Sequence, residues 1–225
     1  MSARVERPTP RESVFGFRRE GPETFERLTD VDRSGLLRYT RYLTFQVGGG
    51  LFSPENMRKY LPYLRSITNL HTLTLAHFRV LSLIPVFNEC FGTFANTLRH
   101  LSIRNAYVTD QQLLYIISQF PLLEDLTIIS LTGAYPGHPV PTTTQSPLLR
   151  GTLILVDPDT REFSDCLATL PGGLNFRSLE FFRCNDPRAV LDACGHSVRS
   201  ISYLWCKKGG TEGKSRSRIR AHVEM

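Results

Sequence analysis

The sequence predicts an α/β fold in which short parallel strands alternate with helices in a solenoid, between disordered termini. Two observations predict it. A short apolar pattern recurs along the chain at similar intervals, and apolar stripes with helical spacing stand between its copies. With 225 residues, 41% of them hydrophobic and 21% charged, the chain is able to bury a substantial core.

The predicted strands share the pattern apolar-x-x-apolar-x-apolar. Its copies lie at residues 40–45, 70–75, 98–103, 123–128, 179–184 and 198–203, with a copy stretched by one residue at 149–155. Successive copies start 25 to 30 residues apart as far as residue 179, and the last step is 19. This spacing is close to the period of leucine-rich repeats, about 20–29 residues. Because side chains alternate along a strand, one face of such a sheet is buried and the other stays open.

The predicted helices connect the strands. Apolar stripes with helical spacing lie at 57–64, 87–94, 113–120, 163–170 and 190–194. Thr109 predicts an N-cap, and Pro54 occupies a favourable first helical position. Pro62 is expected to break or kink its helix, and Pro85 is expected to begin the next one.

One repeat is regular enough to compare with a known family. Residues 98–126 read LRHLSIRNAYVTDQQLLYIISQFPLLEDL. They resemble the cysteine-containing leucine-rich repeat, L-x-x-L-x-L-x-x-C-x-x-I-T-D-x-x-L followed by C-P-x-L-E-x-L, with Ala106 and Phe120 in place of the cysteines. That subtype is typical of F-box proteins. Together with phrases such as RYTRYLTF and LDACGHSVRSI, residues 38–206 resemble the leucine-rich region of fungal F-box-like proteins of the basidiomycete type.

The resemblance implies a protein-interaction scaffold, the substrate-recognition component of a cullin-type ubiquitin ligase. Its repeats would hold a target protein on the concave strand face, and an F-box would hold the adaptor subunit of the ligase. Residues 1–37 contain no evident F-box. The alternatives are a repeat fragment that acts as a decoy binder or has no function, and a small α/β enzyme.

Three regions are expected along the chain. Residues 1–37 form a disordered or partly helical segment, 38–206 the repeat domain, and 207–225 a basic disordered tail. A flexible loop is expected at 132–147, because its four prolines cannot supply sheet hydrogen bonds. The net charge is +6, and residues 206–225 hold six basic against two acidic residues. The repeat domain is therefore close to neutral, which does not favour a nucleic-acid partner.

The composition also bears on compartment and chemistry. No apolar run has the length of a membrane span, and the N-terminus lacks the apolar core of a signal peptide. The five cysteines form no C-x-x-C pair, so we expect a reducing compartment, cytoplasmic or nuclear. Residues 48–50 are a glycine run without the ending of a phosphate-binding loop. We therefore expect no catalytic, cofactor-binding or metal-binding residues and no enzymatic activity.

The candidate functional residues are those expected to point out of the strands onto the concave face, where solenoids bind their partners. They are Tyr42, Thr72, His100, Ser102, Arg104, Asp125, Phe181 and Arg183. His100, Arg104 and Asp125 are expected to form a mixed-charge cluster suited to a polar protein surface. Phe181 would be an aromatic anchor, unless the strand register slips by one residue and places it in the core. The alternative is that all eight are ordinary solvated strand residues.

Overall fold

A computed structural model describes residues 13–17, 33–47, 54–77, 80–133, 146–157, 161–170, 172–184 and 187–204. The expected basic tail at 207–225, the glycine run at 48–50 and most of the loop expected at 132–147 lie outside these residues.

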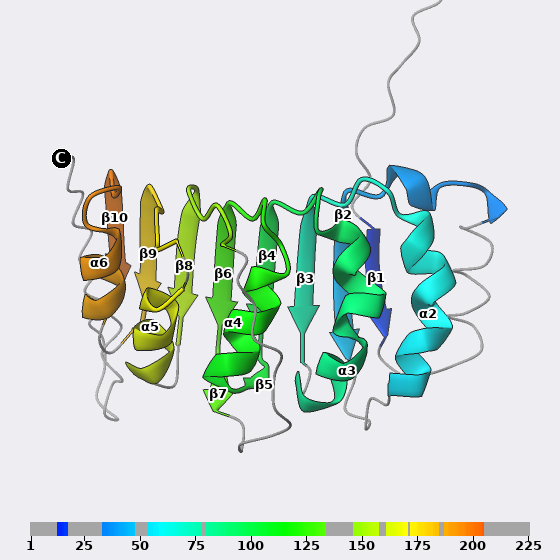
Figure 1. Ribbon diagram of the computed structural model, residues 1–225, viewed down its shortest axis with the longest axis horizontal. Helices are drawn as coiled ribbons and strands as arrows, with labels where there is room; N and C mark the ends of the chain where they lie inside the picture. Colours follow the sequence, from blue (N-terminus) through cyan, green and yellow to red (C-terminus); the bar gives the residue numbers. More distant parts are fainter. Residues whose placement is uncertain are drawn as a thin grey trace, which may run out of the picture.

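Within the described residues, eight parallel strands form one sheet, and their order in the sheet follows the chain (Figure 1). They are β1 (Ser13–Phe17), β2 (Tyr42–Val47), β3 (Thr72–Ala76), β4 (His100–Arg104), β6 (Asp125–Ile129), β8 (Thr152–Val156), β9 (Ser178–Phe182) and β10 (Ser200–Leu204). Two shorter strands, β5 (Tyr107–Val108) and β7 (Thr132–Gly133), pair separately. The predicted α/β class with parallel strands is confirmed.

The helices lie side by side over one face of this sheet (Figure 1). They are α2 (Pro54–Ser66), α3 (Val80–Phe91), α4 (Asp110–Ser118), α5 (Arg161–Ala168) and α6 (Arg188–Cys194), with 3-10 turns η1 (Leu37–Tyr39) and η2 (Gly92–Phe94). Each helix packs against the next one in the chain. Parallel strands require such crossover connections, and helices α2–α6 supply those that follow β2, β3, β4, β8 and β9.

The core fills the space between the helices and the sheet. Alternate strand residues such as Leu73, Leu75 and Ile103 are completely buried there. Phe87 and Phe91 reach them from α3, and the Phe87 ring lies 6.1 Å from the ring of Phe120. Each fully buried aliphatic or aromatic side chain stabilises the fold by about 1.5–3 kcal/mol relative to exposure. The apolar pattern is therefore the main source of stability.

The backbone joins each strand to the next at the edge where the strands begin. The carbonyl oxygens of Arg41, His71, Arg99, Gly151 and Arg177, each directly before a strand, accept two N–H groups from the neighbouring unit. The Arg177 oxygen, for example, accepts from Arg199 N at 2.8 Å and from Ser200 N at 3.1 Å. We call this row the edge ladder. It aligns the starts of the strands and so sets the register of the sheet.

A second regular feature ends the strands. His77, Asn105, Ser130, Asp157 and Arg183 each directly follow a strand and have left-handed backbone, with φ between 45° and 55°. The N–H of Asn105 donates to Ile129 O at 2.8 Å, and that of Ser130 donates to Val156 O at 2.8 Å. The left-handed residue turns the chain out of the sheet and fastens it to the next strand. None of the five is glycine, although this conformation costs other residues about 1–2 kcal/mol.

Helix α4 begins as the sequence predicts. The Thr109 hydroxyl accepts from Gln112 N at 3.3 Å, and the Gln112 side chain accepts from Thr109 N at 3.0 Å, which is a complete capping box. Pro62 does not break its helix, and the expectation that Pro85 begins the next helix is wrong. Helix α2 continues through Pro62, which is exposed, so the carbonyl it leaves without a helical partner can bond to water. Helix α3 begins at Val80, because Pro85 removes only one of its backbone hydrogen bonds.

The N-terminal expectation also needs correction. Residues 13–17, expected to be disordered or partly helical, form β1 beside β2, with Phe15 in register with Phe45 and Phe17 with Val47. The period-two spacing of the two phenylalanines is a strand signal. At the start of the expected loop, Thr132 and Gly133 form β7, because Tyr107 and Val108 of β5 offer a short parallel partner.

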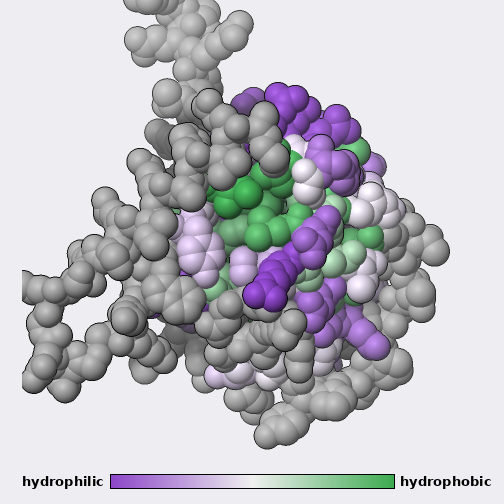
Figure 2. All heavy atoms as spheres, turned by 90° about the vertical axis from the view of Figure 1, so that its left-hand side faces the viewer, coloured by the Kyte–Doolittle hydropathy of each residue, from purple (hydrophilic) through white to green (hydrophobic). Residues whose placement is uncertain are grey.

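Figure 2 shows the end of the molecule at β10 and α6, where an apolar area is framed by hydrophilic residues. Leu191, Ile201 and Tyr203 are half-buried there and pack against the core. The Tyr203 hydroxyl donates to Cys184 O at 2.8 Å, which satisfies its polar end. None of the helices in the described part of the chain combines the length and apolar character needed to span a membrane.

The left-handed residues give a test of the strand ends. Changing Asn105→Val should lower the free energy of unfolding by about 1–2 kcal/mol, because a β-branched side chain is disfavoured in that backbone conformation. Asn105→Gly should leave it unchanged or raise it, since Asn105 is exposed and glycine accepts this conformation. Urea unfolding of both variants makes the comparison. Equal losses for Val and Gly would show that the Asn105 side chain, rather than its backbone, is what matters.

Candidate functional site

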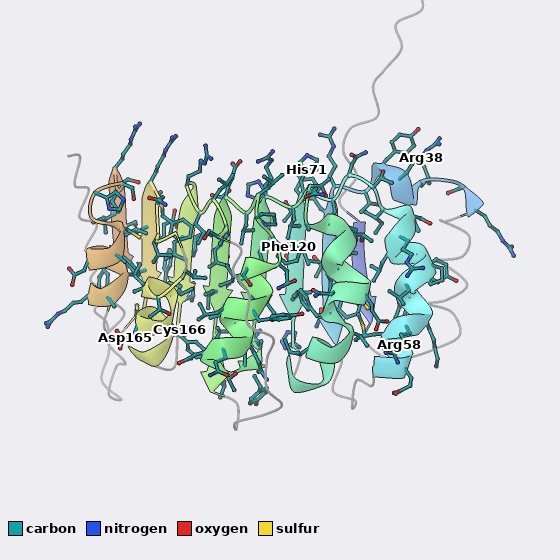
Figure 3. The ribbon with its side chains drawn as sticks, in the orientation of Figure 1. Arg38, Arg58, His71, Phe120, Asp165 and Cys166 are labelled. Carbon is teal, nitrogen blue, oxygen red and sulfur yellow. The ribbon has the colours of Figure 1, made fainter. Side chains whose placement is uncertain are left out.

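The candidate site lies on the outer face of the sheet, defined as the face opposite helices α2–α6 (Figure 3). Strand residues alternate between this face and the core, so Thr72 and Thr74 lie outward while Leu73 and Leu75 are buried. The register places Tyr42, Thr72, His100 and Asp125 in one row across neighbouring strands. The structure therefore brings together four of the eight predicted residues, spaced about 4.8 Å apart by the strands.

The centre of this row is held in place. His100 Nδ1 contacts Asp125 Oδ2, which is a salt bridge when the imidazole is protonated, with 48% and 29% of the side chains exposed. The other carboxylate oxygen, Oδ1, accepts a hydrogen bond of 2.5 Å from Thr152 N. A Cβ on Gly151 would lie 2.8 Å from Asp125 Cγ, so only glycine leaves room for this carboxylate.

Asp125 completes the edge ladder at a step that is irregular, the single such step between strands β2 and β10. At this step the Glu124 oxygen accepts from Gly151 N at 3.0 Å, and the second N–H, that of Thr152, is taken by the Asp125 side chain instead. The irregularity coincides with the repeat that the sequence stretches by one residue, 149–155. The carboxylate is thus committed to the backbone, and His100 is the member of the pair that offers more surface to a partner.

Arg104 does not join His100 and Asp125 as expected. It lies four residues after His100 on β4, which is about 13 Å along the strand. Its Nε donates to Ser102 Oγ at 2.9 Å, and Ser102 is only 7% exposed. The predicted mixed-charge cluster is therefore two separate features, a histidine–aspartate pair at the start of the strands and an arginine–serine pair at their end.

Two residues near the C-terminus, which the sequence pattern predicts to point outward from a strand, do not do so in the structure. Phe181 is fully buried, and the register pairs it with Leu155 in the core, so the outward residue is Phe182. The repeat here begins at Phe176 rather than Leu179, which shifts the alternation by one. Arg183 follows β9 with φ of 54° and forms a salt bridge of 3.3 Å with Asp157, both partners being partly exposed. Such a bridge contributes about 0–1 kcal/mol.

Sequence reasoning missed an apolar strip on the outer face. It consists of Ile129, Ile154, Val156 and Phe182, which lie on three neighbouring strands and are all half-buried. The register also places Arg104 directly beside Ile129. The signal was present, because strands β6, β8 and β9 each end in two consecutive apolar residues, so both faces of the sheet are apolar there.

Three of the buried cysteines, Cys90, Cys166 and Cys194, are protonated at neutral pH. Burial raises the pKa of the Cys90 and Cys194 thiols to about 11, and burial with the nearby Asp110 carboxylate raises that of Cys166 to about 12. A thiolate is the nucleophilic form, so these three side chains act as small apolar core residues. Among the described residues, no group of three or more histidine, cysteine or carboxylate side chains is arranged to hold a metal ion.

The space beside Gly151, which the Asp125 carboxylate occupies, gives a test of how that carboxylate is held in place. Gly151→Ala should lower the free energy of unfolding by about 1–3 kcal/mol, because the carboxylate must move and lose its bond to Thr152 N. In an Asp125→Ala background the same change should cost at least about 1 kcal/mol less. A double-mutant cycle in urea measures this coupling. Strictly additive losses would show that the glycine serves the backbone alone.

Comparison of the chain with protein-family models, curated proteins and solved structures finds no match. The resemblance of residues 98–126 to the cysteine-containing leucine-rich repeat therefore stays a prediction. The outer face, with its fixed histidine–aspartate pair and its apolar strip, is the feature of the described structure that bears on function.

Proposed function

We propose that the chain is a protein-recognition module, a leucine-rich-repeat solenoid whose outer face binds a partner protein without catalysing a reaction. The observation that supports the proposal is the composition of that face. The apolar strip of Ile129, Ile154, Val156 and Phe182 adjoins Arg104, and the His100–Asp125 pair lies at the other end of the strands. An apolar centre with polar groups around it is the usual composition of a protein interface.

The shape of the site favours a macromolecule over a small molecule. The outer-face residues lie on the strands of an open sheet rather than inside a cavity, and they extend over six strands, β2 to β9. At about 4.8 Å per strand that is roughly 24 Å across. Small-molecule sites enclose most of their ligand, whereas extended faces of this kind suit a protein surface.

The biological role we propose follows from the resemblance of residues 38–206 to F-box-like proteins. In such a protein the repeats select the substrate of a cullin-type ubiquitin ligase, and a separate adaptor subunit connects it to the ligase. The target would occupy the outer face. The adaptor would bind elsewhere on the chain, so the two interactions can be tested one at a time.

The target interaction is tested with substitutions on the outer face. Val156→Asp and, separately, His100→Ala combined with Arg104→Ala should each reduce capture of a specific partner by about tenfold or more, because hot-spot truncations cost 2 kcal/mol or more. Asp125 is left in place because it supports the backbone. The measurement is quantitative mass spectrometry of proteins retained by the immobilised chain, followed by the affinity of the purified partner.

The matched control is Lys59→Asp, which changes an exposed charge on α2, on the opposite side of the sheet. It should leave capture unchanged, and urea unfolding should show all three variants folded. A partner lost with Lys59→Asp and retained with Val156→Asp would contradict the proposal and place recognition on the helical face.

The ligase role is tested with the purified adaptor subunit at micromolar concentration. One-to-one complex formation with the full chain, measured by size-exclusion chromatography with light scattering, is the expected result. Absence of binding by a folded chain would contradict the ligase role and leave the chain as a binder that does not deliver its partner.

A further inference from the structure

A basic ridge runs along the edge of the sheet where the strands begin. Its residues directly precede strands or stand one position earlier, and they are Arg41, His71, Arg99, Arg150, Arg177 and Arg199. Figure 3 shows nitrogen-tipped side chains projecting in a row along this edge. The edge ladder is what produces the row, because it brings equivalent residues of neighbouring units to the same level.

A carboxylate neutralises the positive charge in the middle of the ridge, at Arg99, but not at the end of the ridge beside β8 to β10. Glu124 occupies the equivalent position before β6, and Arg99 Nη1 lies 2.5 Å from its carboxylate. Before β8, β9 and β10 the side chains of Arg150, Arg177 and Arg199 are exposed, and within the described part of the chain no carboxylate forms a salt bridge with any of them.

These three arginines are held close together. The Gly151 oxygen accepts from Arg177 N at 2.9 Å, and the Arg177 oxygen accepts from Arg199 N at 2.8 Å. The three arginines are therefore attached to neighbouring strands about 4.8 Å apart, so their backbones span about 10 Å in all. Like charges on neighbouring strands destabilise a sheet. An anion bound between these exposed guanidinium groups would offset the repulsion among them.

The arginines line a hollow with further hydrogen-bonding groups. Its volume is about 670 Å³, and Asn175, His196 and Ser197 lie in its wall with Arg150, Arg177 and Arg199. His196 Nε2 lies 3.2 Å from Asn175 Oδ1, and Ser197 Oγ donates to Phe176 O at 3.0 Å, so both side chains are oriented by the protein. None of the lining residues is acidic.

We propose that this hollow binds a phosphate group carried by a segment of a partner protein. The planar guanidinium matches phosphate oxygens in pairs, and a phosphorylated side chain carries close to two negative charges and three acceptor oxygens. A single carboxylate would satisfy one of the three guanidinium groups, whereas a phosphate can bridge neighbouring ones. That the phosphate belongs to a protein rests on the proposed function; the phosphate site itself rests on the arginines.

The site is separate from the outer-face residues used above. The apolar strip lies at the strand ends and the His100–Asp125 pair lies on β4 and β6, whereas the hollow lies at the starts of β8 to β10, beside Gly195 to Ser197, which follow the C-terminal end of helix α6. A partner that contacts both sites would be recognised at two places. The apolar strip would bind its apolar side chains, and the arginines would bind its phosphate. Loss of either contact should leave the other in place.

The test uses the full chain and fluorescently labelled peptides of neutral sequence at physiological salt. One peptide carries one phosphoserine, one has glutamate at that position, and one has serine there. Fluorescence anisotropy should show the phosphopeptide binding about tenfold or more tightly than the glutamate peptide, with no binding of the serine peptide. Equal affinity for phosphate and glutamate, or no binding of the phosphopeptide at millimolar chain concentration, would overturn the proposal.

Variants locate the site. Arg177→Ala combined with Arg199→Ala should weaken phosphopeptide binding by about tenfold or more, and should not lower the urea midpoint because it relieves repulsion. Arg65→Ala, an exposed arginine on α2 at the opposite end of the sheet, is the matched control and should change nothing. Unchanged binding by the double variant would refute the site.

Two further arms separate the possible failures. Inorganic phosphate should displace the peptide only at a concentration well above that of the unlabelled phosphopeptide, and equal potency would show that the ligand is free phosphate rather than a protein segment. Val156→Asp should leave phosphopeptide binding unchanged. If the outer face does not bind a partner protein, the hollow should still bind the phosphopeptide. If the hollow does not bind the phosphopeptide, the outer face should still bind its partner protein.

Discussion

The edge ladder is the constraint on which the rest of this structure depends. Five carbonyl oxygens, each directly before a strand, accept two N–H groups from the next unit, and this pairing holds the strand starts level. Level starts give the in-register rows of core residues, the row from Tyr42 to Asp125 and the basic ridge. At the step from β6 to β8 the second N–H, that of Thr152, would lack an acceptor, and the Asp125 carboxylate supplies it.

Much of the fold could be predicted because it follows from local periodicity. The apolar pattern predicts the strands, and the Thr109 cap predicts the start of α4. The failures have physical causes. Phe181 went to the wrong face because Leu179 was taken as the first residue of a repeat that begins at Phe176. Strand β1 was missed because its sequence lacks the leading apolar residue of the pattern, having Glu12 three residues before Phe15.

The candidate site was less predictable than the fold. The pattern identifies which residues point outward, but not which of them are already engaged, as Asp125 is with Thr152 N. The overall composition also does not reveal how the charged residues are distributed over the surface. Residues 38–206 are close to neutral in sum, yet basic residues recur directly after the first residue of several copies of the apolar pattern, as Arg41, Arg99 and Arg199 do. Only an aligned sheet turns that recurrence into a charged edge.

The separation of the two sheet faces has an evolutionary consequence. Core packing involves the inward residues, such as Leu73, Leu101 and Leu126, while the outward neighbours Thr72, Thr74 and Thr127 take no part in it. Mutations on the outward positions can therefore accumulate without repacking the interior. Under the function proposed above, a lineage of such chains could exchange one binding partner for another by drift and selection at these positions, while its architecture stays the same.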